Sequence, residues 1–119
     1  MRIVIFFLAI GFFFSANNAN AQEKIDKKHT KVNFEVSGVC KMCKTRIEEA
    51  ALFTKGVKMA SWNKETQQIE VIYNHKKTSE MKVHEAIAAA GHRTEELKAK
   101  EEAYQKLPDC CKYREVEVH

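Results

Sequence analysis

Residues 32–43 have the sequence VNFEVSGVCKMC, in which an alternating apolar pattern leads into two closely spaced cysteines. Apolar and polar residues alternate as far as Val36, a pattern typical of a strand with one buried face. Gly38 ends the alternation, and helical spacing of apolar residues begins near Cys43. The stretch therefore predicts a strand, a loop that carries Cys40 and Cys43, and a helix.

The rest of the chain extends this pattern to strand, helix, strand, strand, helix and short strand. Thr78 or Ser79 is expected to cap the second helix, and Gly91 to close it. This order predicts an α+β fold, a ferredoxin-like βαββαβ sandwich with two helices on one face of a four-stranded antiparallel sheet. The three later strands are expected at 57–63, 68–73 and 92–97.

The first residues have the features of an export signal. A basic start precedes an apolar run at 3–14, and Ala19-Asn20-Ala21 forms a small-residue cleavage motif. A membrane span needs ~20 apolar residues, so this run predicts a cleaved signal and no stable membrane insertion after cleavage. The expected localisation is periplasmic or secreted. The expected organisation is a signal peptide at 1–21, a flexible lead-in at 22–31, a folded domain at 32–97 and a C-terminal extension at 98–119.

Length and composition limit the class of protein. The chain has 119 residues, of which 45% are hydrophobic and 30% charged, and its formal net charge is +4. That length suits a single domain and excludes a large barrel or a two-domain enzyme. The basic surplus is small and scattered, so no nucleic-acid partner is expected.

The Cys40-x-x-Cys43 pair carries the predicted chemistry. Two intervening residues let both sulfurs approach one point, and a helix N-terminus beside them stabilises thiolate. Thiolate is the form that binds soft metals and attacks disulfides. The spacing alone leaves three interpretations open: a metal site, a redox pair and a structural disulfide.

The segment from Ser37 to Cys43 resembles the heavy-metal-associated domain family. The resemblance covers about 32–97 and includes the end of the second helix at Gly91; Val39 stands where the family usually has Met. It implies the βαββαβ fold and one soft ion, usually Cu(I), held between Cys40 and Cys43. The family includes copper chaperones, modules of copper-exporting ATPases and a periplasmic mercury-binding protein. Further positions that carry the resemblance are Ile47, Glu48, Ala50, Gly56, Val57, Ala89 and Ala90.

Three further residues are candidate metal ligands. His92 follows the second-helix glycine, at a position that lies close to the metal in the family fold, so it is a candidate third ligand. Cys110 and Cys111 lie outside the resemblance. They are candidate ligands that join Cys40 and Cys43 or form a second site, and a disulfide is the alternative.

The remaining charged stretches suggest surface positions. Lys41, Lys44 and Arg46 surround the loop, where they offset thiolate charge or dock an acidic partner. A helix is expected at 99–107, and the end at 114–119 is expected to fray. The other histidines are expected at the solvated surface; they are His29, His75, His84 and His119.

The sequence thus predicts a small exported metal-binding protein, monomeric and not an enzyme. It is expected to bind Cu(I), with Hg(II), Zn(II) and Cd(II) as alternatives that also suit two thiolates. The expected donor or acceptor is a metal-exporting ATPase, an efflux component or a copper-requiring protein. The main alternative is periplasmic thiol–disulfide exchange through Cys40 and Cys43, and a third is a structural domain with two disulfides.

Overall fold

The structure, a computed structural model, describes residues 27–119. The expected signal peptide and the first part of the lead-in, residues 22–26, lie outside the described residues. In the described part, no helix combines the length and the hydropathy needed to cross a membrane. The elements in chain order are β1 (His29–Glu35), α1 (Lys41–Leu52), β2 (Val57–Trp62), β3 (Gln68–Asn74), α2 (Glu80–Ala89), α3 (Glu101–Gln105) and the 3-10 helix η1 (Asp109–Cys111).

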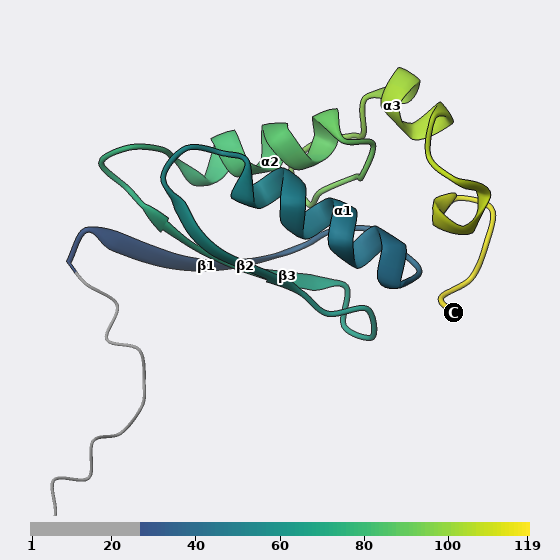
Figure 1. Cartoon of the computed structure of the whole chain (residues 1–119), viewed down its shortest axis with the longest axis horizontal. Coiled ribbons are helices and arrows are strands. Elements are labelled where there is room, and N and C mark those ends of the chain that lie inside the picture. Colours follow the sequence, from purple (N-terminus) through teal and green to yellow (C-terminus); the bar gives the residue numbers. More distant parts are fainter. Residues whose placement is uncertain (1–26) are drawn as a thin grey trace, which may run out of the picture.

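The three strands form one antiparallel sheet with β3 in the centre, in the order β1-β3-β2. Helices α1 and α2 lie over one face of this sheet, and α3 and η1 follow at one end (Figure 1). The order of the first five elements confirms the expected ferredoxin-like α+β arrangement.

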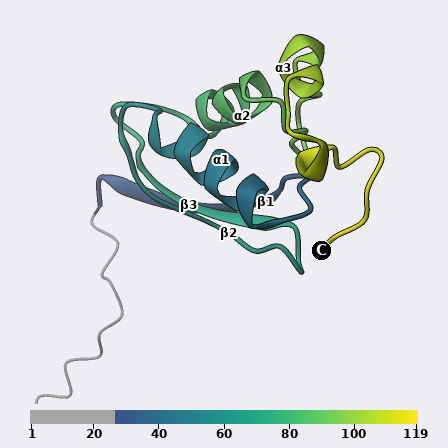
Figure 2. The ribbon, with the colours of Figure 1, turned by 45° about the vertical axis from the view of Figure 1, so that its right-hand side comes forward.

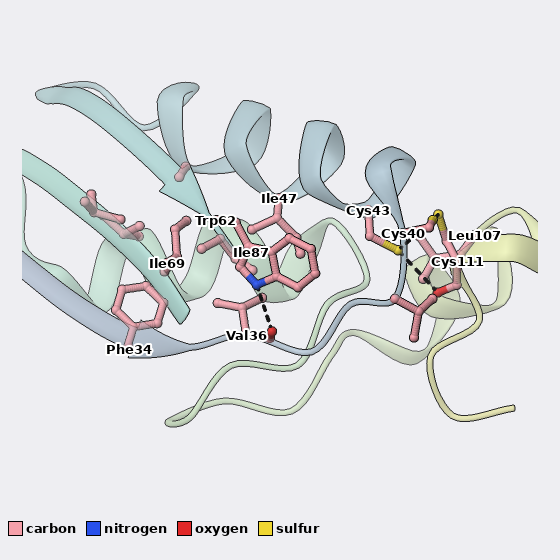
Figure 3. Close-up of a cluster of buried hydrophobic side chains, with 14 of the residues drawn as sticks. Phe34, Val36, Cys40, Cys43, Ile47, Trp62, Ile69, Ile87, Leu107 and Cys111 are labelled. Atoms are coloured by element: carbon pink, nitrogen blue, oxygen red, sulfur yellow. Dashed lines mark hydrogen bonds between the residues drawn. The ribbon is translucent and has the colours of Figure 1, made fainter. Parts of the chain in front are cut away.

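The core lies between the sheet and the two long helices. Alternate residues of β1 and β3 point into it, as the period of two in their sequences requires. Apolar residues of α1 and α2 meet them from the other layer at helical spacing (Figure 3). The fully buried members that define these layers are Phe34, Ile69, Val71, Ile47, Val83 and Ile87, each at most 2% exposed.

Local side-chain contacts fix the turn and the helix start that the sequence predicted. The Asn63 side chain accepts hydrogen bonds from the backbone N–H groups of Glu65 and Thr66, which closes the hairpin between β2 and β3. Ser79 caps α2, and its side chain accepts a hydrogen bond from the Lys82 N–H.

The first strand begins earlier than expected. The sequence predicts a flexible lead-in at 22–31, but β1 starts at His29, which pairs with Asn74. Their polar sequence gives no strand signal. The partner strand β3 extends to Asn74. Backbone pairing with β3, rather than burial of apolar side chains, therefore keeps these residues in the sheet.

The expected fourth strand at 92–97 is absent from the described structure. A single bridge, Val36 to Thr94, lies beside the end of β1 where this strand was expected. The chain turns directly after it, because the Thr94 hydroxyl accepts hydrogen bonds from the N–H groups of Glu96 and Leu97. The local turn therefore replaces a longer strand pairing.

His84 is buried rather than solvated. The residue is 0% exposed, its ring stacks on Phe34 with centroids 3.8 Å apart, and its Nδ1 lies 2.7 Å from the Thr94 hydroxyl oxygen. The expected surface position was therefore wrong. The signal was present in the sequence, because His84 follows Val83 and lies three residues before Ile87 on the apolar face of α2.

We expect Trp62→Phe to reduce the free energy of unfolding by about 1–3 kcal/mol. The Trp62 indole N–H donates to the carbonyl of Val36 over 3.0 Å, and both residues are buried. Phenylalanine would leave that carbonyl without this partner. Urea unfolding followed by circular dichroism measures the change. Phe53→Ala is the control, since Phe53 is 93% exposed and should change stability by less than about 0.5 kcal/mol. An equal loss in both variants would contradict the assignment.

Candidate metal centre

The four cysteines meet at the N-terminal end of α1. Cys40 directly precedes this helix and Cys43 lies in its first turn, with their sulfurs 3.5 Å apart. The Cys40 sulfur is also 3.6 Å from the sulfur of Cys111 on η1 (Figure 3). All four cysteines are free thiols. The fold therefore brings Cys111, 71 residues away in sequence, to the predicted cysteine pair.

Close packing against Trp62 holds the loop before α1. A Cβ atom at Gly38 would lie 2.9 Å from two carbons of the indole ring and 3.1 Å from Cβ of Cys43. Real side-chain carbons essentially never approach so closely, so the position requires glycine. The Gly38 backbone N–H also donates to the Gln67 side chain over 3.0 Å. Loop, indole ring and Cys43 are thus packed into one unit.

The C-terminal extension packs against the same end of the domain (Figure 2). Its helix α3 is shorter than the expected helix at 99–107. Tyr104 and Leu107 are buried, at 2% and 4% exposure. The Tyr113 hydroxyl donates to the Gly91 carbonyl over 2.9 Å and accepts from the Arg93 N–H over 3.0 Å. These contacts position η1, and with it Cys111, beside α1.

The last residues also bind the domain, whereas they were expected to fray. The backbone N–H of His119 donates to the Val39 carbonyl over 2.8 Å. Lys64, in the hairpin between β2 and β3, donates to the His119 carbonyl over 3.0 Å. Charged sequence alone does not reveal such contacts, because both partners are distant in the chain. The end of the tail therefore lies against Val39 of the cysteine loop and against the hairpin between β2 and β3.

Burial and hydrogen bonding shift the pKa values of the Cys40, Cys43 and Cys111 thiols in different directions. Burial acts to raise the pKa of Cys40, but the backbone N–H groups of Cys43 and Met42 and the thiols of Cys43 and Cys111 outweigh it, and the pKa is lowered. Burial raises the pKa of Cys43. Burial also raises the pKa of Cys111, and contacts with the Cys43 and Cys40 sulfurs raise it further. Cys40 is thus the thiol most readily ionised among these three.

Cys110 completes a group of metal-ligand type. The sulfurs of Cys40, Cys110 and Cys111 all lie within 4.8 Å of one another, and this is the one such group of three found among residues 27–119. Cys110 is partly exposed, and its sulfur lies 3.8 Å from the thioether sulfur of Met42. Met42 is 48% exposed. Two soft sulfur groups therefore lie at the accessible side of the buried thiols.

His92 lies outside this thiol group. Its ring is 0% exposed, Nδ1 lies 2.9 Å from the Ser37 carbonyl, and the ring stacks on Tyr113 with centroids 5.5 Å apart. Burial lowers the pKa of His92, which favours the neutral ring; the Ser37 contact opposes this shift and Arg46 adds to it. His92 therefore packs against the C-terminal extension through Tyr113.

The basic residues around the loop differ in their contacts. Lys44 forms an ion pair with Glu48 and donates to the Trp62 carbonyl over 3.0 Å. It therefore connects α1 to β2 and is less available to a partner than expected. Lys41 is exposed and Arg46 is half-buried.

The fold and the thiol group together define a ferredoxin-like α+β domain with a sulfur-rich site at the start of its first helix. The model of the heavy-metal-associated domain matches residues 33–93, and the chain belongs to that family. The match ends before the extension, so Cys110 and Cys111 are an addition to the family region. Membership and the thiol group support heavy-metal binding.

Solved structures give the same assignment. The chain is similar to the CopZ metallochaperone, with 29% identity and a TM-score of 0.53 over 55% of this chain and 98% of that chain. It is similar to oxidized MerP from Ralstonia metallidurans CH34, with 30% identity and a TM-score of 0.53 over 56% and 93%. The N-terminal domain of a potential copper-translocating P-type ATPase from Bacillus subtilis, in the Cu(I)-loaded state, is 30% identical with a TM-score of 0.53 over 56% and 84%. No curated protein matches the chain.

We expect iodoacetamide to label Cys110 before the buried thiols of the metal-free protein. Cys43 and Cys111 are each 0% exposed, so their labelling requires local opening and should be at least ~10-fold slower. Peptide mass spectrometry after timed labelling measures the rates. In denaturant all four thiols should react at similar rates. Equal rates in the native protein would mean that the extension does not cover the site.

We expect acid to destabilise the protein partly through His92. Its pKa is lowered from 6.5 in the folded state, so the unfolded chain binds the proton more readily. The contribution of His92 is therefore present above pH 6.5 and is lost as the pH falls through its lowered folded value. Urea unfolding at several pH values measures this slope. The His92→Gln variant should have a shallower slope; an unchanged slope would assign the acid sensitivity to other groups.

Proposed function

We propose that the protein binds Cu(I) through Cys40 and Cys43 and delivers it to a metal-transport or copper-requiring protein outside the cytoplasm. The observation that carries this proposal is the pair of sulfurs 3.5 Å apart at the N-terminus of α1. Soft thiolate ligands favour Cu(I), and the lowered pKa of Cys40 favours the thiolate form. Hg(II), Zn(II) and Cd(II) are alternative ions for the same ligands.

Delivery proceeds by ligand exchange. Each cysteine loses a proton as it binds the ion, and no electron is transferred. A thiolate of the acceptor joins the ion and one original sulfur leaves. A second acceptor thiolate then replaces the other original sulfur, and the freed cysteines take up protons. Cys40 is only 6% exposed, so the acceptor approaches from the side of Cys110 and Met42, where the cluster is more accessible. Apart from these S–H bonds, only metal–sulfur bonds change, so this function is binding and transfer rather than catalysis.

The proposed location and partners rest on sequence and on relatives. The predicted signal peptide at 1–21 supports export to the periplasm or the exterior. The similar structures include a metallochaperone and a domain of a potential copper-translocating ATPase. A metal-exporting ATPase, an efflux component or a copper-requiring protein is therefore the proposed donor or acceptor.

We expect the reduced protein to remove Cu(I) from a coloured chelator under anaerobic conditions. The Cys40→Ser/Cys43→Ser variant should lose at least ~10-fold in affinity, since metal sites lose this much even from outer-shell changes. Absorbance of the chelator complex measures the competition. Met81→Leu is a control for sulfur content, because Met81 is an exposed residue of α2, outside the thiol group. Circular dichroism and Trp62 fluorescence confirm folding of each variant.

Failure of the wild type to compete would exclude Cu(I) delivery. The thiol–disulfide alternative would then gain weight, since the lowered pKa of Cys40 beside Cys43 also suits exchange. An equilibrium of the Cys40–Cys43 pair with glutathione, together with turnover of a disulfide substrate, would identify that activity.

A further inference from the structure

The extension carries thiols to a site that the family region already contains. Cys110 and Cys111 lie beyond the matched residues 33–93, yet their sulfurs lie within 4.8 Å of Cys40 and of each other. Cys40 is at the same time 3.5 Å from Cys43. The Cys40 sulfur therefore belongs both to the Cys40/Cys43 pair and to the group of Cys40, Cys110 and Cys111.

The spacing of these sulfurs suits more than two ligands on one ion. Two sulfurs on opposite sides of an ion, each ~2.3 Å away, lie ~4.6 Å apart, whereas three in a plane lie ~4.0 Å apart. Within the set of Cys40, Cys110 and Cys111, the Cys40 and Cys111 sulfurs are 3.6 Å apart and no two sulfurs are more than 4.8 Å apart. The 3.6 Å distance is nearer to the three-ligand spacing than to the linear one, so Cys40 and Cys111 are closer together than a linear two-sulfur site requires.

The position of the added thiols is fixed by packing. Lys112, the next residue, donates to the Tyr104 and Gln105 carbonyls at the end of α3, over 3.3 Å and 2.7 Å. Arg114 pairs with Glu101 of the same helix and lies over the Tyr104 ring, 3.9 Å from its centroid. Cys111 itself is 0% exposed. These contacts hold both cysteines at the site, as a ligand-bearing segment requires.

We propose that Cys40, Cys110 and Cys111 form a three-thiolate site for a soft monovalent or divalent ion, and that this site shares Cys40 with the Cys40/Cys43 pair. The inference rests on the proposed function and extends it. Because Cys40 belongs to both sets, one ion passes between the triad and the pair without leaving the protein. Three thiolates also retain the ion more firmly than two.

X-ray absorption of the protein loaded with less than one equivalent of Cu(I) tests the triad. We expect three sulfur ligands in the wild type and two, with a shorter copper–sulfur distance, in Cys110→Ala/Cys111→Ala. Competition with the chelator should show at least ~10-fold weaker binding in that variant. Met81→Leu is the control for sulfur content, since Met81 is an exposed residue outside the thiol group, so this variant should retain three sulfur ligands.

The outcomes separate the two proposals. If the wild type does not remove Cu(I) from the chelator, the proposed function fails. If it binds Cu(I) through two sulfurs, and the Cys110→Ala/Cys111→Ala variant has the same spectrum and affinity, only the triad is overturned. Folding of the variant is checked by Trp62 fluorescence. The single variant Cys110→Ala, which changes a partly exposed residue, gives the same test if the double variant is unstable.

Discussion

The hydrogen bond from the Trp62 indole to the Val36 carbonyl joins the residue that follows β1 to the last residue of β2. The same ring occupies the space where Gly38 would carry a side chain. The loop therefore packs closely against the indole before it enters α1, and Cys40 and Cys43 follow at the start of that helix. The geometry of the sulfur pair depends on this contact, together with the hydrogen bonds that join Gly38 to Gln67 and Val39 to His119.

Periodicity in the sequence predicted most of the fold, and the C-x-x-C spacing predicted the central cysteine pair. Alternation located the strands around Phe34 and Val71, and local capping by Ser79 located the start of α2. These signals are local, so a single sequence reveals them. The predicted fourth strand failed because Thr94 directs a turn that competes with strand pairing. The alternation of apolar and polar residues does not show whether a local turn will be more stable than strand pairing.

The arrangement of the extension was beyond prediction from sequence. Its position depends on pairs such as Tyr113 with Gly91 and His119 with Val39, whose members are far apart in the chain. The resemblance to a known family ended before Cys110, so it gave no guide either. The sequence could name Cys110 and Cys111 as candidate ligands, yet only the packed extension shows that their sulfurs reach Cys40.

The cover formed by the extension also affects how the thiols survive outside the cytoplasm, where the proposed function places the protein. A disulfide between Cys40 and Cys43 would remove both ligands, and oxidising compartments favour such bonds. Folded oxidoreductases must touch a sulfur to oxidise it, and three of the four sulfurs belong to residues at most 6% exposed. The tail across Val39 thus limits access to these sulfurs, which slows their oxidation by other proteins.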